Sequence, residues 1–220
     1  MIKVLYVDLG CHKGNEIDFI LDHKNPNINF DIIGFEANPI LAKELAEKYK
    51  NNSNITIHNK CITDKEDKII TLKKYPSDSS TSIYTKNNVS PTGNYIKVEG
   101  VKLSSVLKKI NLDIYDIKVL KSNIEGAEYN LLKDLDKSNM FIFDLYLGSG
   151  QAPYAMLEDI KKCKEIKNKI KECIDILKKH KISIHRFAPR ERDAKSKKSK
   201  HKNINLNKMI IDKYNESHKK

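Results

Sequence analysis

The feature that most constrains the fold is an alternation of short, apolar, β-branched runs with segments of helical period over the first sixty residues. The first of these runs (IKVLYVDL) is bounded by Gly10, as a buried strand would be. Pro39 suits the first turn of a helix. Strands are expected at 2–9, 30–36 and 54–62, and helices at about 15–23 and 39–49. This order predicts an α/β fold built on a parallel sheet with right-handed crossovers.

The rest of the chain extends the same pattern. Residues 64–98 are less regular and predict a loop and a hairpin lying over the sheet. Further strands are expected at 95–103, 116–124, 140–148, 181–189 and 203–212, and helices at 104–110, 125–135 and 156–179. The last two strands would pair antiparallel around a polar loop at 190–202. The sequence thus predicts a mostly parallel seven-stranded sheet with an antiparallel last strand and helices on both faces.

The formal net charge of +12 is distributed unevenly along the chain. Residues 1–157 hold 20 basic and 20 acidic side chains, whereas residues 158–220 hold 21 basic and 9 acidic ones. A basic region of this kind attracts polyanions such as nucleic acid, anionic lipid or a phosphorylated substrate. The alternative, that the lysines simply form solvated helix faces and loops, has equal weight at this point.

Several classes of protein are excluded by composition. No stretch approaches the ~20 apolar residues of a membrane helix, and the N-terminal segment lacks the features of a signal peptide. The four cysteines include no CxxC pair and are too few for a disulfide scaffold in 220 residues. We therefore expect one domain over residues 1–220 and a cytoplasmic protein with free thiols. Within that domain, 1–148 would bind a cofactor and 149–220 would form a basic helix and hairpin.

The strongest chemical motif follows the first strand, where Asp8, Gly10 and Gly14 form the pattern D-x-G-x-x-x-G. Ligands of doubly wound sheets bind beyond the carboxyl ends of the strands, and a glycine turn there offers backbone N–H groups. An acid in this turn repels a pyrophosphate but suits a cofactor with an amino group, such as S-adenosylmethionine. Glu36, at the end of the second strand, is placed to bind ribose hydroxyls. Together they favour a methyltransferase-type nucleoside site over a dinucleotide site.

Four successive segments, VDLGCHKGNEI, IIGFEANP, IHNKCITD and LKSNIEGAEYNLLKDL, resemble the signatures of FkbM-type methyltransferases. The resemblance spans roughly residues 4–148 and implies a Rossmann-like class I methyltransferase fold, S-adenosylmethionine as donor, and O-methylation of a sugar or small metabolite. It also implies the residues that bind the cofactor. Asp8, Gly10, Cys11 and Gly14 would line the methionine and turn region, Glu36 would hold the ribose beside Asn38, and Cys61 and Ile62 would flank the adenine.

The chain departs from the family pattern near the reacting methyl group. Asn123 stands where the family's Lys-x-Asp motif has an acid, and Asp144 precedes Leu-Tyr where Glu and His are common. Cys11 and His12 replace a small residue and Asn in the first loop. The resemblance therefore supports the cofactor more strongly than the chemistry.

Methyl transfer to oxygen requires in-line alignment and removal of one hydroxyl proton. The candidate bases are Glu125, Asp144 and His12, and Glu125 ranks first because it follows the fourth parallel strand and matches the family's Glu. Its alternative role is to stabilise a helix N-terminus. Asn123 can orient a hydroxyl but cannot act as a base. No His, Cys, Asp or Glu cluster has metal-ligand spacing, so no metal is predicted.

The expected loop at 190–202 would emerge on the cofactor side of the sheet, and its cations would surround the acceptor. These cations are Arg190, Arg192, Lys195, Lys197, Lys198, Lys200 and Lys202. They predict an anionic acceptor: a phosphorylated glycan, a nucleotide-linked sugar or a nucleic acid. Two alternatives remain: a nucleic-acid methyltransferase, despite 7% aromatic residues and no Trp, and a non-catalytic nucleoside-binding protein, which Asn123 would explain.

Overall fold

A six-stranded parallel sheet forms the centre of the computed structural model, which describes residues 1–64, 66, 68–74, 81–82, 93–124, 127–148, 164–182, 184–186 and 205–218. In order across the sheet its strands are β10 (Ile184–Arg186), β9 (Leu145–Gly148), β8 (Ile117–Ser122), β1 (Ile2–Leu9), β2 (Ile28–Phe35) and β3 (Ile55–His58). All five pairings are parallel. Strand order reverses at β1, so the carboxyl ends of β1 and β8 meet at the point where such sheets bind ligands.

Helices cover both faces of this sheet because side chains alternate along β1. Val4 and Tyr6 pack toward one face and Leu5 and Val7 toward the other, and all four are buried. The first face is covered by α1 (Asn15–Asp22), α2 (Pro39–Tyr49) and α8 (Leu206–His218), and the second by α3 (Leu103–Leu107), α4 (Glu128–Lys137) and α6 (Lys164–Lys179). A short 3-10 helix, η1, spans Leu112–Ile114. The predicted α/β fold with a mostly parallel sheet is confirmed.

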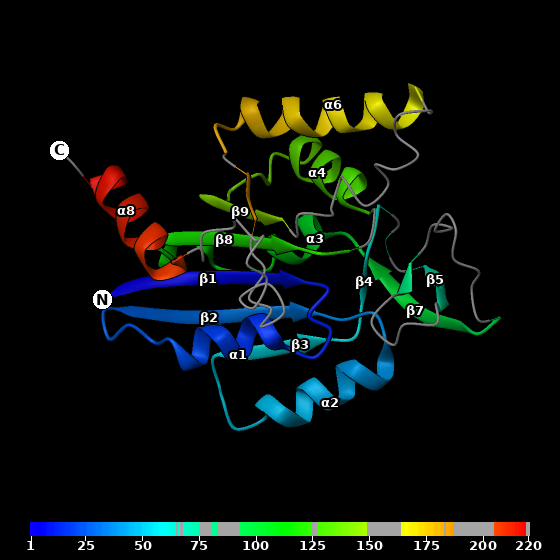
Figure 1. The fold of residues 1–220 in the computed structure, drawn as a ribbon, viewed down its shortest axis with the longest axis horizontal. Helices are drawn as coiled ribbons and strands as arrows, with labels where there is room; N and C mark the ends of the chain where they lie inside the picture. The colour runs from blue at the N-terminus through cyan, green and yellow to red at the C-terminus, as the bar shows by residue number, and fades with distance from the viewer. Residues whose placement is uncertain are drawn as a thin grey trace, which may run out of the picture.

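A second, four-stranded sheet lies beyond the arrowheads of β1 and β2 (Figure 1). Its order is β4 (Cys61–Ile62), β7 (Tyr95–Val101), β5 (Ile69–Lys74) and β6 (Thr81–Ser82). The strand expected at 54–62 is therefore two strands, β3 in the central sheet and β4 in the small one. Asn59 lies between them and donates its side-chain amide to the carbonyls of Glu36 (2.9 Å) and Ala37 (3.2 Å).

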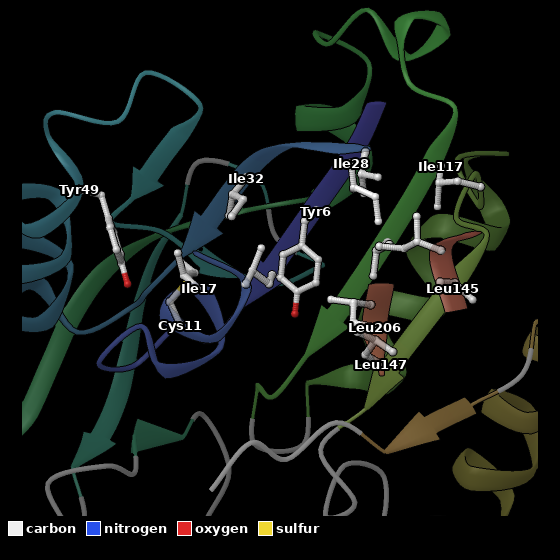
Figure 2. Packing of buried hydrophobic residues seen from close by; sticks show 14 of the residues in the cluster. Tyr6, Cys11, Ile17, Ile28, Ile32, Tyr49, Ile117, Leu145, Leu147 and Leu206 are labelled. Atoms are coloured by element: carbon white, nitrogen blue, oxygen red, sulfur yellow. The ribbon is translucent and has the colours of Figure 1, made fainter. Parts of the chain in front are cut away.

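The prediction of a strand at 203–212 is wrong, because helix α8 begins at Leu206 and runs to His218. Leu206 and Ile210, four residues apart, are both buried in the core. Figure 2 shows Leu206 in the same layer as Tyr6, Leu145 and Leu147. The side chain of Asn205 accepts a hydrogen bond from the Lys208 amide (3.0 Å), as a helix cap does. The predicted antiparallel last strand and hairpin are therefore wrong as well, and the loop at 190–202 lies outside the described residues.

Candidate functional site

Two glycines shape the turn between β1 and α1, and both have left-handed backbone angles. Gly10 has φ +80°, and a Cβ there would lie 2.3 Å from the backbone oxygen of Asn123. Gly14 has φ +78°, and its Cβ would lie 2.4 Å from the hydroxyl of Tyr49 and 2.8 Å from Leu45 Cδ2. Gly10 thus lets the turn after β1 touch the turn after β8. Gly14 lets the turn approach helix α2.

The backbone amides of this turn are bonded within the protein. The amides of Gly10 and Cys11 donate to the carbonyl of Phe35 (2.9 and 3.2 Å), and the amide of Gly14 donates to the carbonyl of Cys11 (2.8 Å). The amide of His12 donates to a carboxylate oxygen of Glu36 (2.7 Å). The expected supply of N–H groups for an anion is therefore largely consumed. This turn is poorly suited to a pyrophosphate.

Glu36 follows β2 directly, is 6% exposed, and has its carboxylate fixed by two backbone amides. Oε2 accepts from His12 (2.7 Å) and Oε1 accepts from Asn38 (2.8 Å). Each carboxylate oxygen can accept a second hydrogen bond. The Asn38 side chain caps α2 by accepting from the amide of Ile40 (3.1 Å). Glu36 is therefore a preorganised acceptor at the carboxyl edge of the sheet.

Asp8 forms an ion pair that the sequence did not reveal. It lies opposite Lys121 on β8, and Asp8 Oδ1 is 2.7 Å from Lys121 Nζ, with side-chain exposures of 0% and 2%. Burial raises the pKa of Asp8 to about 6, although the neighbouring ammonium opposes this shift. Burial by itself would lower the pKa of Lys121, but the charge of Asp8, together with smaller contributions from Glu16, Cys11 and the hydrogen bond to Asp8, makes the net shift upward. A lysine in a strand of otherwise mostly apolar residues was the available signal.

The remaining cofactor candidates differ in where their side chains lie. Cys11 is fully buried, its Sγ lies 3.3 Å from the carbonyl of Asp8, and it occupies space left by Gly34, whose Cβ would lie 2.7 Å from that sulfur. Cys61 belongs to a small buried cluster against which Ala37 packs, and burial together with the charge of Glu36 raises the pKa of its thiol to about 11. Ile62 is buried in the core on the α3 and α4 face. Cys61 thus lies near Ala37, the residue that follows Glu36, whereas the thiol of Cys11 lies in the core.

Of the catalytic candidates, the structure places Asn123 but not Asp144 at the glycine turn. The backbone of Asn123 touches the glycine turn, and its amide donates to the carbonyl of Leu9 (2.9 Å). Asp144 precedes β9 and instead bonds the backbone of Lys118, three residues before Lys121 on β8. Three residues span roughly 10 Å along a strand, so Asp144 lies about that far from Lys121 and the carboxyl edge. Asp144 is thus distant from the glycine turn, and Glu125 lies outside the described residues.

Glu128, which no sequence motif singled out, is 1% exposed at the start of α4. Its carboxylate accepts from the amide of Ile124 (2.9 Å), so it holds the turn that carries Asn123. An acid in the first turn of the expected helix was the available signal. Among the described residues, no group of three or more His, Cys, Asp or Glu is arranged to hold a metal ion. Nor does any described helix have the length and apolar character needed to cross a membrane.

Comparison with known proteins identifies the family. Residues 8–180 match the methyltransferase FkbM domain. A search of curated proteins finds no match. The crystal structure of methyltransferase FkbM from Methylobacillus flagellatus KT is 18% identical, with a TM-score of 0.36, over 60% of this chain and 29% of that one. This chain thus spans less than a third of that protein. Because the family match covers most of its length, the chain belongs to the FkbM methyltransferase family.

Proposed function

We propose that this methyltransferase uses S-adenosylmethionine and methylates a hydroxyl on a sugar, a glycan or a small anionic metabolite. The observation that supports the cofactor best is the Glu36 carboxylate, held by the amides of His12 and Asn38 next to a glycine turn whose own amides are largely consumed. Such a site offers hydrogen-bond acceptors rather than donors. It suits a ligand with ribose hydroxyls and an ammonium group and disfavours a phosphate.

The residues at the carboxyl edge fit this cofactor. Among the described residues, Oδ2 of the fully buried Asp8 has no hydrogen-bond partner, and such an acceptor suits a donor on the ligand. Asp8 and the turn from Gly10 to Gly14 would hold the methionine part, Glu36 and Asn38 the ribose, and Cys61 and Ile62 the adenine side. Cys11 would contribute its backbone, since its thiol lies in the core. The cofactor supplies an activated methyl group on a sulfonium.

The protein's own contribution is alignment and proton removal. Glu125 is our proposed base, and Asn123 would orient the acceptor hydroxyl by hydrogen bonding. We leave Asp144 out of this set because it bonds the backbone of Lys118. Without a competent base the protein would bind the nucleoside and not turn over. This second function is favoured by Asn123 alone.

The proposed anionic acceptor is supported by the 21 basic and 9 acidic residues of 158–220. Strand β10 is parallel to β9 and ends at Arg186, so the chain leaves it at the carboxyl edge of the sheet. Replacing the lysines at 195–202 with Gln should raise the KM for the acceptor and leave cofactor affinity nearly unchanged. An unchanged acceptor KM would refute this part of the proposal.

Isothermal titration of the folded protein with S-adenosylmethionine and S-adenosylhomocysteine tests the cofactor, and no binding of either would refute it. Transfer of labelled methyl groups to a panel of glycans, sugar nucleotides and RNAs then separates enzyme from binder and identifies the acceptor class. We further propose that residues 1–220 form one methyltransferase domain and that the protein is cytoplasmic. Among the described residues, Cys11, Cys61 and Cys173 are buried free cysteines, which supports a reducing compartment.

A further inference from the structure

Lys121 is the least expected residue of the central sheet. It lies in β8 between buried Leu120 and Ser122 and is itself 2% exposed. A buried ammonium is costly unless it is paired and hydrogen-bonded. Its position therefore calls for partners that satisfy it fully.

The ammonium of Lys121 contacts both the strand end and the glycine turn. Nζ lies 2.7 Å from Oδ1 of Asp8 and donates to the carbonyl of Gly10 at 2.9 Å. That carbonyl belongs to the same peptide group as the amide of Cys11, which donates to the carbonyl of Phe35 on β2. One peptide group is thus fixed at one end by β8 and at the other by β2.

The next amide in the chain belongs to His12, and it binds Oε2 of Glu36. Lys121 is therefore connected to the Glu36 carboxylate through two consecutive peptide groups of the turn. We infer that Lys121 is a positioning residue of the cofactor site: its bond to the Gly10 carbonyl sets the orientation of the turn and hence of the His12 amide that holds Glu36. This inference rests on the proposed cofactor. An ion pair with a purely structural role would affect folding and leave cofactor affinity alone.

The test compares K121M with K118M in otherwise unchanged protein. Lys118 is on the same strand and donates to the carbonyl of Tyr115 (2.9 Å), away from the carboxyl edge, so the same substitution there is a matched control. Loss of a hydrogen bond from a charged donor should weaken binding of S-adenosylhomocysteine by roughly 10- to 100-fold in K121M. Titration is done well below the Tm of each variant. Equal affinity in K121M and K118M would overturn the inference.

Because K121M leaves Asp8 as an unpaired buried charge, a second pair of variants keeps the test decisive if it does not fold. D8N/K121M and D8N/K121Q contain no buried charge at either position, and only the latter retains a side-chain donor. Hydrogen exchange of the Cys11 and His12 amides, measured by NMR, should be slower in D8N/K121Q. Equal exchange in the two would overturn the inference. Wild-type protein that binds no cofactor would refute the proposed function, while this exchange comparison would still decide the role of Lys121.

Discussion

Replacing Gly10 with Ala should lower the stability of the protein for two reasons. The structure allows the cost of each to be estimated separately. An L-residue at φ +80° pays about 1–2 kcal/mol for the left-handed conformation. The new Cβ would lie 2.3 Å from the carbonyl oxygen of Asn123, a backbone atom, so the turns after β1 and β8 must move apart by more than half an ångström to restore contacts of 3.0 Å. Overpacking of this kind costs about 1–3 kcal/mol. We expect G10A to lower stability by about 3 kcal/mol.

The control is Gly93→Ala, because Gly93 has nearly the same φ, +81°, and nothing within 4 Å of its Cβ position. It should show only the conformational cost of about 1–2 kcal/mol. For a chain of this size 1 kcal/mol corresponds to about 2–4 °C in Tm, so calorimetry should separate the two variants clearly. Denaturant titration gives the free energies directly. If G10A unfolds with the same loss of stability as G93A, the close approach of the two turns is not a source of strain.

Three other outcomes follow from the site and its core. E36Q should weaken binding of S-adenosylhomocysteine by roughly 10- to 100-fold, because a side-chain amide cannot accept from both His12 and Asn38. The control E47Q, at an exposed position, should bind normally. Equal affinities of E36Q and E47Q would contradict the role of Glu36. G34A should lose about 1–3 kcal/mol in denaturant titration because its Cβ would press on Cys11 Sγ and Ile57 Cδ1, both at 2.7 Å; unchanged stability would mean that this contact can relax. Burial raises the pKa of the Cys11, Cys61 and Cys173 thiols, to about 11 for Cys61 and about 12 for Cys173. Iodoacetamide at neutral pH should therefore leave these three cysteines unmodified until urea is added, as measured by mass spectrometry. Rapid labelling of the native protein would show that they are accessible.

Segments with local signals were predicted well. Helices α1 and α2 and strands β1 and β2 lie close to the expected positions, because apolar periodicity, Pro39 and the cap at Asn38 act within a few residues. Helix α8 was missed because its local pattern resembles that of a strand. An apparent alternation in NINLNKMIID concealed the four-residue spacing of Leu206 and Ile210, which only burial distinguishes.

The sequence by itself determined the glycine turn and the position of Glu36, because a φ near +80° favours glycine and a parallel strand delivers its last residues to the carboxyl edge. Only the tertiary structure decided which groups those residues meet. Asp8 and Lys121 are 113 positions apart and become partners through the register of β1 and β8, and that register leaves Asp144 away from the edge. Strand register depends on packing of the whole sheet. The composition of one strand therefore could not reveal that a buried lysine fixes the turn.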